Sequence, residues 1–285
     1  MKIKKPIFII GVGRSGSTVF FDMLSRHNDV TWMAEKLLNN FPSKPILNRI
    51  LMSSLDIPIV GGMTRRVFEP GECYTYWNNL YRGFGRPFRD LKKHDVTVRA
   101  KRRIRLSLSQ LISRKRERLL VKITGWNRIC FLREIFPDAL FVLVKRDPRA
   151  VINSFLNVDF WSGWQGPLNW RMGEISDEQK EELYRFDFSF VALAGIKIEI
   201  LHNAFVAACS EVNCNNILEI KYEDFCGQPV QTIRNAIDFC GLEWTIQFEE
   251  MLRSFKIKNT NYKWKQDLTK DQQKIAEYYY RKIGY

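Results

Sequence analysis

The chain has 285 residues, 45% of them hydrophobic, which is enough to bury a large core in one domain. Its net charge of +14 favours an anionic partner, without distinguishing a nucleotide or an acidic substrate from nucleic acid or a membrane surface. The six cysteines form no CxxC pair, so we expect neither a metal site nor a disulfide framework. We expect no transmembrane segment, because no apolar run approaches the roughly 20 residues of a membrane span.

Strand and helix patterns alternate along the chain, beginning with an apolar run at 7–10, a glycine loop, and apolar residues at helical spacing. Further strands are predicted at 119–123, 140–144 and 217–220, and further helices at 127–136, from 148, at 188–209 and at 229–240. This alternation predicts an α/β fold with a central parallel sheet flanked by helices on both faces. Sheets of this class bind ligands at the carboxyl ends of their strands.

The glycine loop, Gly-Val-Gly-Arg-Ser-Gly-Ser-Thr at 11–18, has the spacing of a phosphate-binding loop. In such a loop, backbone N–H groups and the N-terminus of the following helix hold phosphate oxygens. The lysine that nucleoside triphosphatases carry before the last hydroxyl residue is replaced by Ser17, and the cation of the loop is Arg14. This difference argues against an ATP or GTP hydrolase and suits an anion of lower charge that needs no metal ion.

The loop resembles the 5′-phosphosulfate loop of sulfotransferases that use 3′-phosphoadenosine 5′-phosphosulfate (PAPS). The similarity is greatest to bacterial members and to the tyrosylprotein and Golgi carbohydrate branches, in which Arg-Ser-Gly-Thr/Ser-Thr is usual. The resemblance implies a P-loop-containing nucleotide-binding fold. It also assigns five residues to the 5′-phosphate, namely Arg14, Ser15, Gly16, Ser17 and Thr18.

A second candidate anion site follows the predicted strand at 140–144, where Arg146 stands at the strand end and Ser154 eight residues later. Pro148 suits the first turn of a helix, and two turns bring Ser154 back towards the strand. A guanidinium and a hydroxyl together make a phosphate clamp. The alternative to a phosphate clamp is that Arg146 is an exposed arginine and that the neighbouring Asp147 caps the helix. The pair resembles the 3′-phosphate motif of the same family.

Weaker similarities extend the resemblance to nearly the whole chain except roughly residues 40–115. The segment 120–124 resembles a family strand that ends in Lys-Thr/Asp-Pro, although Gly125 stands where proline is common. Tyr222 belongs to a Tyr-Glu-Asp-Phe segment whose tyrosine, in the family, contacts the nucleotide. Lys263 lies in a segment similar to a late Lys-Trp loop, and residues 283–285 resemble a terminal Leu-Gly-Tyr.

Sulfuryl transfer to a hydroxyl requires a base for the acceptor proton and cations for the charge on the leaving oxygen. By residue count, Glu35 occupies the place of the catalytic glutamate in tyrosylprotein-type enzymes; alternatively, it is a carboxylate in the first turn of a helix. His27 competes for the role of base. Lys122 would bridge the transferred group and the leaving oxygen, or be a solvated lysine at a strand end. The predicted reaction is an in-line displacement that releases adenosine 3′,5′-bisphosphate and needs no metal.

The acceptor is not identified by any motif. We expect one domain, residues 1–285, with an irregular insertion at about 39–118 that shapes the acceptor side. The basic stretch 99–118 either attracts an acidic glycan or peptide or is a solvated helix face. Tryptophan side chains either stack on the acceptor or pack in the core, and they are Trp161, Trp164 and Trp170.

Two other functions compete with sulfuryl transfer: a P-loop kinase with an atypical loop, and a non-enzymatic protein that binds polyanions or nucleic acid. The missing lysine disfavours the first, and the absence of an RNA-binding motif disfavours the second. The basic residues before the first strand superficially resemble a signal peptide, but the apolar run is too short for one. We therefore expect a cytoplasmic protein of bacterial type rather than a protein of the Golgi lumen.

Overall fold

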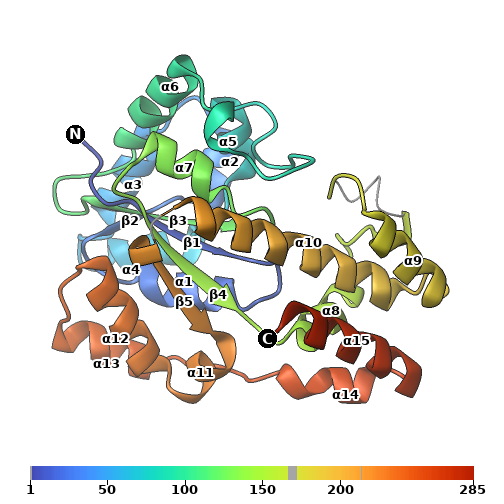
Figure 1. Ribbon diagram of the computed structural model, residues 1–285. Helices are drawn as coiled ribbons and strands as arrows, with labels where there is room; N and C mark the ends of the chain where they lie inside the picture. The colour runs from blue at the N-terminus through green and yellow to red at the C-terminus, as the bar shows by residue number, and fades with distance from the viewer. Residues whose placement is uncertain (1, 166–171, 213) are drawn as a thin grey trace.

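The computed structural model describes residues 2–165, 172–212 and 214–285. Its five-stranded sheet has the order β2-β3-β1-β4-β5, and every pairing is parallel (Figure 1). The strands are β1 (Ile7–Gly11), β2 (Val30–Trp32), β3 (Arg118–Thr124), β4 (Leu140–Lys145) and β5 (Ile217–Lys221). The predicted α/β fold with a central parallel sheet is confirmed. The short strand β2 was not predicted, because three residues give too little pattern to recognise.

Helices cover both faces of the sheet, and the alternation of side chains along β1 shows how. Ile7 and Ile9 pack with residues of α1 (Ser17–Ser25) and α12 (Pro229–Cys240). Phe8 and Ile10 pack on the opposite face, with α5 (Tyr74–Leu80), α6 (Val98–Ser109), α7 (Ile129–Ile135) and the end of α10 (Phe190–Glu211). Burial on both faces explains why these strands are continuous apolar runs rather than alternating ones.

A third group of helices lies beyond the carboxyl end of β4, on the right of Figure 1. It consists of α8 (Pro148–Leu156), α14 (Trp264–Asp267), α15 (Lys270–Ile283) and the first part of α10. Gly195 allows α10 and α15 to approach closely, because a Cβ atom there would lie 2.2 Å from the ring of Tyr279. These helices form a wall above the strand ends, where ligands bind in such folds.

The region from 39 to 118 is more regular than expected. It contains the end of α2 (Glu35–Asn40), followed by α3 (Ile46–Ser54), α4 (Val60–Val67), α5 and α6. Each is short, and only a few side chains of each are buried, such as Met52 on α3 and Trp77 on α5. Short helices with a narrow apolar face give a weak periodic signal. The remaining helices are α9 (Asp177–Arg185), α11 (Tyr222–Gly227) and α13 (Ile246–Arg253).

Helix α10 has the length and apolar composition of a membrane span, and it is the one such helix in the described part of the chain. This corrects the expectation that no apolar segment reaches that length. Over half of the apolar window, 56%, is buried inside the protein, against α8, α15 and the sheet. Because the core helix of a globular protein meets the same criteria, α10 is only weak evidence for a membrane span.

Candidate active site

The glycine loop turns tightly between β1 and α1. The Ser15 N–H donates to the Val12 carbonyl at 3.1 Å, and Arg14 and Gly16 have left-handed φ values of 72° and 89°. Gly16 also lies against the Tyr222 ring, which a Cβ atom would approach to 2.2 Å, so only glycine satisfies both constraints. The Ser15 hydroxyl is buried and has no hydrogen-bond partner among the described residues.

Arg146, at the end of β4, ties the glycine loop to a distant segment. Its Nη1 donates to the Arg14 carbonyl at 3.0 Å, its Nε to Asn261 Oδ1 at 2.7 Å, and its Nη2 to Thr260 Oγ1 at 3.0 Å. Its guanidinium carbon lies 4.6 Å from the centroid of the Tyr222 ring. The strand-end arginine is therefore held in place from three sides.

Ser154 lies on α8 and also contacts the glycine loop. Its Oγ accepts from Arg14 Nε at 2.9 Å. The predicted pair thus meets at Arg14, with Arg146 at its backbone and Ser154 at its side chain. Asp147 caps α8, as the alternative interpretation had it, but Arg146 is engaged rather than a free exposed arginine.

Tyr222 is the first residue of α11, and its hydroxyl donates to the Lys258 carbonyl at 3.1 Å. Lys263, in contrast, is exposed, and none of its side-chain contacts within the described chain joins it to this cluster. In the same loop, Thr260 and Asn261 are the residues that accept hydrogen bonds from Arg146. These two residues were missed in the sequence because polar residues in a loop carry no pattern of their own.

Lys122 extends from β3 to the start of α1. Its Nζ donates to Thr18 Oγ1 at 3.0 Å and lies 3.2 Å from Glu72 Oε1. The residue is buried on the α1 side of the sheet, with its ammonium 5.9 Å from the Phe21 ring centroid. The glycine loop contains no lysine, and Lys122 of the neighbouring strand β3 places an ammonium group at the first turn of α1 instead.

Glu72 is a site residue that the sequence did not reveal. Besides pairing with Lys122, its carboxylate accepts from Thr124 Oγ1, which lies 3.0 Å from each oxygen. The Tyr74 hydroxyl donates to the Thr124 carbonyl at 2.9 Å and so fixes the same strand end. Glu72 belongs to the 39–118 region, and no motif surrounds it.

Glu35 begins α2, directly after β2, and its carboxylate lies against Gly71. A Cβ atom on Gly71 would be 2.2 Å from Glu35 Oε2, so this glycine makes room for the carboxylate. Glu35 is exposed, yet partial burial of its carboxylate and then the charge of Glu72 raise its pKa above the usual range, while Lys122 opposes them. Glu35 is therefore a stronger base than a free glutamate, close to Glu72 and Lys122.

His27 lies at the other end of α1 from Thr18, about 13 Å away for a helix of nine residues. The imidazole is buried, its Nδ1 accepts from the Asp29 N–H at 3.1 Å, and its Nε2 donates to the Glu243 carbonyl at 2.7 Å. Both ring nitrogens are thus engaged in structural contacts.

A cleft of about 630 Å³ opens beside these groups, and we call it the Glu72 cleft. Its lining comes from the glycine loop and the start of α1, from the 39–118 region, from the segment after β3, and from α8, α10 and the segment after α8. The residues are Gly13, Arg14, Ser17, Thr18, Glu72, Tyr74, Gly85, Arg86, Pro87, Thr124, Gly125, Trp126, Arg128, Phe155, Phe160, Trp161, Ser162, Met172, Lys197 and Leu201. Trp161 lines the cleft, but most of its side chain is buried because it packs with residues of α8, α10, α14 and α15. The side chain of Trp164 and all of Trp170 lie outside the described residues.

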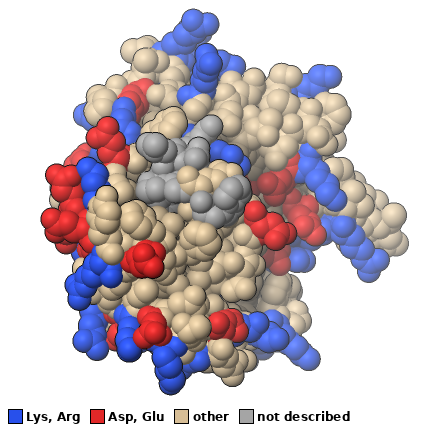
Figure 2. Space-filling model, turned by 90° about the vertical axis from the view of Figure 1, so that its right-hand side faces the viewer, with Lys and Arg blue, Asp and Glu red and all other residues tan. Residues whose placement is uncertain are grey.

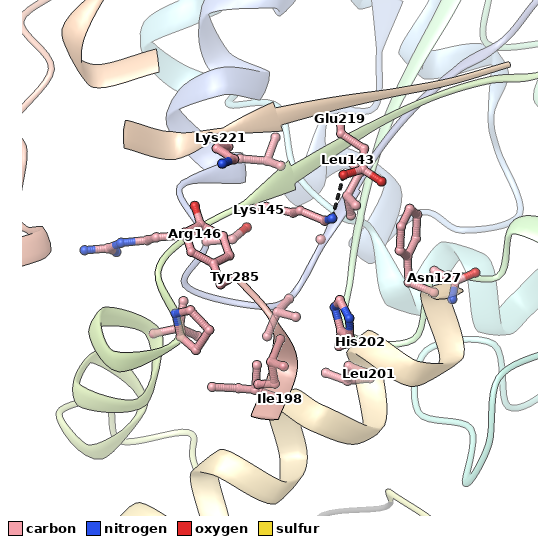
Figure 3. A pocket seen from close by; sticks show the side chains of 18 of the residues that line it. Asn127, Leu143, Lys145, Arg146, Ile198, Leu201, His202, Glu219, Lys221 and Tyr285 are labelled. Carbon is pink, nitrogen blue, oxygen red and sulfur yellow. Dashed lines mark ion pairs between the residues drawn. The ribbon is translucent and has the colours of Figure 1, made fainter. Parts of the chain in front are cut away.

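A second, smaller pocket of about 150 Å³ lies between the glycine loop, the ends of β4 and β5, and α10 (Figure 3). Lys145 and Glu219 point towards each other across it and form an ion pair of 2.5 Å. His202 lies beside them, and burial followed by the charge of Lys145 lowers its pKa. In this pocket Lys145 is thus paired with a carboxylate, while Arg146 and Lys221 line the same pocket without an ion pair among the described residues.

The basic stretch 99–118 lies apart from the Glu72 cleft. No residue of this stretch is among the described residues that line the cleft, and helix α6 is at the top of Figure 1. Lys101 pairs with Glu134 at 2.7 Å, Arg105 donates to the Ile135 carbonyl at 2.8 Å, and Arg116 pairs with Asp56 at 2.7 Å. These basic residues serve the fold, whereas residues 72–74 and 85–87 are the part of the 39–118 region that lines the cleft.

The face of the molecule shown in Figure 2 carries both basic and acidic side chains. On the face shown in Figure 2, acidic side chains gather between the basic ones. Among the described residues, no three His, Cys, Asp or Glu side chains converge in a way that could hold a metal ion.

The sequence matches the model of the sulfotransferase family over residues 6–246. No curated protein matches it. Among solved structures, sulfotransferase STF9 from Mycobacterium avium is similar, with 14% identity, coverage of 99% of this chain and 77% of that one, and a TM-score of 0.60. The sulfotransferase domain of the curacin biosynthetic pathway has 14% identity, 98% coverage of both chains and a TM-score of 0.53.

The sulfotransferase domain of the olefin synthase from Synechococcus PCC 7002 is also similar, with 17% identity, coverage of 98% of this chain and 96% of that one, and a TM-score of 0.52. At identities this low, the likeness concerns the fold. The prediction of a P-loop-containing nucleotide-binding fold is thereby confirmed.

Proposed function

The chain belongs to the sulfotransferase family, and we propose that it transfers a sulfuryl group from PAPS to a hydroxyl of an acceptor. The observation that carries this proposal is the position of Lys122. The glycine loop has no lysine of its own, and Lys122 reaches Thr18 from β3, within 3.2 Å of Glu72. A phosphate-binding loop, a cation and a carboxylate are the groups that sulfuryl transfer to a hydroxyl needs, and two carboxylates, Glu72 and Glu35, interact electrostatically with Lys122.

The donor half of the proposed site fits the geometry of the loop. The buried Ser15 hydroxyl without a described partner is a group that a phosphate oxygen would satisfy. We assign Arg14, Ser15, Gly16, Ser17 and Thr18 to the 5′-phosphate, where the N-terminus of α1 adds its dipole. When bound, PAPS supplies an activated sulfuryl group whose leaving group is a phosphate.

For the 3′-phosphate we propose Arg146 and Ser154, with Tyr222 beside the nucleotide. Asn261 and Thr260 already hold the side chain of Arg146. Binding of a 3′-phosphate would therefore replace existing hydrogen bonds and would cost little side-chain entropy. Lys263 remains a proposed contact of the nucleotide on the basis of the family resemblance alone.

In the proposed reaction Glu35 accepts the proton of the acceptor hydroxyl, whose oxygen forms a bond to sulfur as the bond from sulfur to the phosphate oxygen breaks. Lys122 stabilises the negative charge that develops on that leaving oxygen. The products are the sulfated acceptor and adenosine 3′,5′-bisphosphate, with no covalent enzyme intermediate and no metal ion. We propose that residues 1–285 act as one domain, and a cytoplasmic location of bacterial type stays part of the proposal.

Binding of the donor product tests the proposal without knowledge of the acceptor. Thermal unfolding is measured with adenosine 3′,5′-bisphosphate, with ATP and Mg²⁺, and with an oligonucleotide. A ligand at about 100 times its Kd raises the free energy of unfolding by about 2.7 kcal/mol, and we expect this from the bisphosphate alone. Stabilisation by ATP and Mg²⁺ instead would favour a kinase, and stabilisation by the oligonucleotide would favour a nucleic-acid-binding protein.

The transfer step is tested with radiolabelled PAPS against glycans, tyrosine peptides and small alcohols or phenols. We expect label to pass to at least one class of hydroxyl compound in the wild type and to none in Glu35→Gln.

A further inference from the structure

The residues that line the Glu72 cleft carry a surplus of positive charge. Its lining includes Arg14, Arg86, Arg128 and Lys197, and Glu72 is its one acidic residue within the described part of the chain. Glu72 is already engaged by Lys122 at 3.2 Å. The cleft is therefore cationic on the side away from Lys122.

Lys197 carries most of the inference. It projects from α10 into the cleft and is half-buried, with its ammonium 4.4 Å from the Phe155 ring centroid, and it has no hydrogen bond or ion pair among the described residues. Residues 1, 166–171 and 213, which lie outside the described part, include no Asp or Glu that could pair with it. A buried ammonium without a carboxylate is costly, and burial lowers the pKa of Lys197 to about 8.

Arg128 is a further cation in the lining of the cleft, and the Asp90 carboxylate accepts from its backbone N–H at 2.8 Å. Its buried guanidinium donates to backbone carbonyls, those of Phe84 at 3.0 and 2.7 Å, Gly85 at 3.4 Å and Trp126, and forms no ion pair with a carboxylate of the described chain. These bonds fix the segment that carries the exposed Arg86. Asp90 and Glu72 offset part of the charge of Arg128, so Lys197 and Arg86 are lining cations that lack a nearby carboxylate partner among the described residues.

A second lysine close to α10, Lys282, is paired with carboxylates. Lys282 contacts Glu178 at 3.0 Å, Glu199 at 2.9 Å, and Glu182. Glu199 lies on the same helix as Lys197, two residues later, and points to the other side. Lys197 thus differs from Lys282 in having no carboxylate partner among the described residues.

We propose that the acceptor is a small hydroxy compound with a carboxylate, sulfate or phosphate group, and that Lys197 and Arg86 hold this anionic group. A volume of about 630 Å³ is the size of a small-molecule site. The remaining walls are apolar or aromatic, formed by Trp126, Phe155, Phe160, Trp161 and Met172, and suit an apolar portion between the hydroxyl and the anion. This inference rests on the proposed function and names the acceptor class for the same site.

The test uses the full chain saturated with adenosine 3′,5′-bisphosphate, and inorganic sulfate as the probe of the anionic subsite. Sulfate is titrated against sodium chloride of equal ionic strength, and Tm is followed. We expect sulfate to raise the Tm of the wild type, with an apparent Kd at least about fivefold weaker in Lys197→Met and in Arg86→Met than in the wild type. Lys197→Arg should retain the response, and Arg102→Met, an exposed arginine of α6 outside the cleft, is the control for net charge.

A labelling experiment removes dependence on the folding of the variants. Limited acetylation with acetic anhydride at pH 7.5, read by mass spectrometry, should modify Lys197 faster than exposed lysines, and sulfate should slow that modification. The inference is overturned if sulfate affects wild type and Lys197→Met equally, if chloride acts as strongly as sulfate, or if sulfate leaves the labelling rate of Lys197 unchanged. Failure of the bisphosphate itself to stabilise the wild type would instead defeat the proposed function.

Discussion

The donor side and the Glu72 cleft differ in how their cations are held. On the donor side, Arg146 is bonded to Asn261, Thr260 and the glycine loop, and Lys122 to Thr18 and Glu72. In the cleft, Lys197 lacks any acidic partner among the described residues. The difference teaches that hydrogen bonds within the chain hold the donor-side cations in place, whereas the ammonium of Lys197 has no hydrogen-bond partner among the described residues and is left for a ligand.

Among the variants that test this comparison, Glu35→Gln should have the largest effect on turnover. Loss of a general base lowers turnover by about 10²–10⁴-fold, while the stabilisation by adenosine 3′,5′-bisphosphate should not change. Because the proton acceptor must be ionised, the wild-type rate should fall as the pH falls through the raised pKa of Glu35. Glu72→Gln removes a charge that raises this pKa, so its acid limb should move to lower pH. If Glu72→Gln alone abolishes turnover, Glu72 rather than Glu35 is the base.

Lys122→Met should lower kcat by about 10²–10³-fold, because it removes the cation from the leaving oxygen. It also leaves the Glu72 carboxylate without its ammonium partner, which we expect to cost roughly 1–3 kcal/mol of unfolding free energy. The double variant Lys122→Met/Glu72→Gln should regain most of the stability and none of the turnover. Urea unfolding of the four proteins of this cycle checks the first expectation, and recovery of turnover in the double variant would contradict the role of Lys122.

Gly16→Ala should distort the glycine loop on the donor side. The left-handed φ and the Tyr222 ring, 2.2 Å from a Cβ atom, oppose any side chain at this position, and we expect a loss of roughly 1–3 kcal/mol together with weaker bisphosphate binding. Gly227→Ala is the matched control, since a Cβ atom there meets no other atom within 4 Å. Calorimetric titration of both variants with adenosine 3′,5′-bisphosphate measures the difference, and equal affinities would show that the loop tolerates the change.

The smallest effect concerns Lys197. Its pKa is lowered from 10.5 to about 8, so the unfolded chain binds more protons between these pH values and the stability of the wild type should rise with pH across that window. Lys197→Met should be the more stable protein at pH 7, by roughly 2–4 °C in Tm if about 1 kcal/mol is recovered, and the gap should narrow towards pH 10.5. A difference in Tm between the two proteins that does not change with pH would mean that Lys197 is not desolvated.

Much of the donor side could be predicted from the sequence because each part is a short motif at the end of a buried strand. Glycine spacing located the loop, and the apolar runs located the strand ends that carry Lys122 and Arg146. Glu72, Arg86 and Lys197 could not be found in this way. They come from three segments that only tertiary packing brings together, and Lys197 stands in an apolar helix whose pattern predicts a core position.

Arg14 belongs to both regions, and this has a consequence for kinetics. Its backbone accepts from Arg146, its side chain donates to Ser154, and the same residue lines the Glu72 cleft. A donor that fixes Arg14 therefore shapes the surface that the second substrate meets. We expect an ordered addition in which the nucleotide binds first, and by reciprocity each substrate should raise the affinity for the other by the same factor.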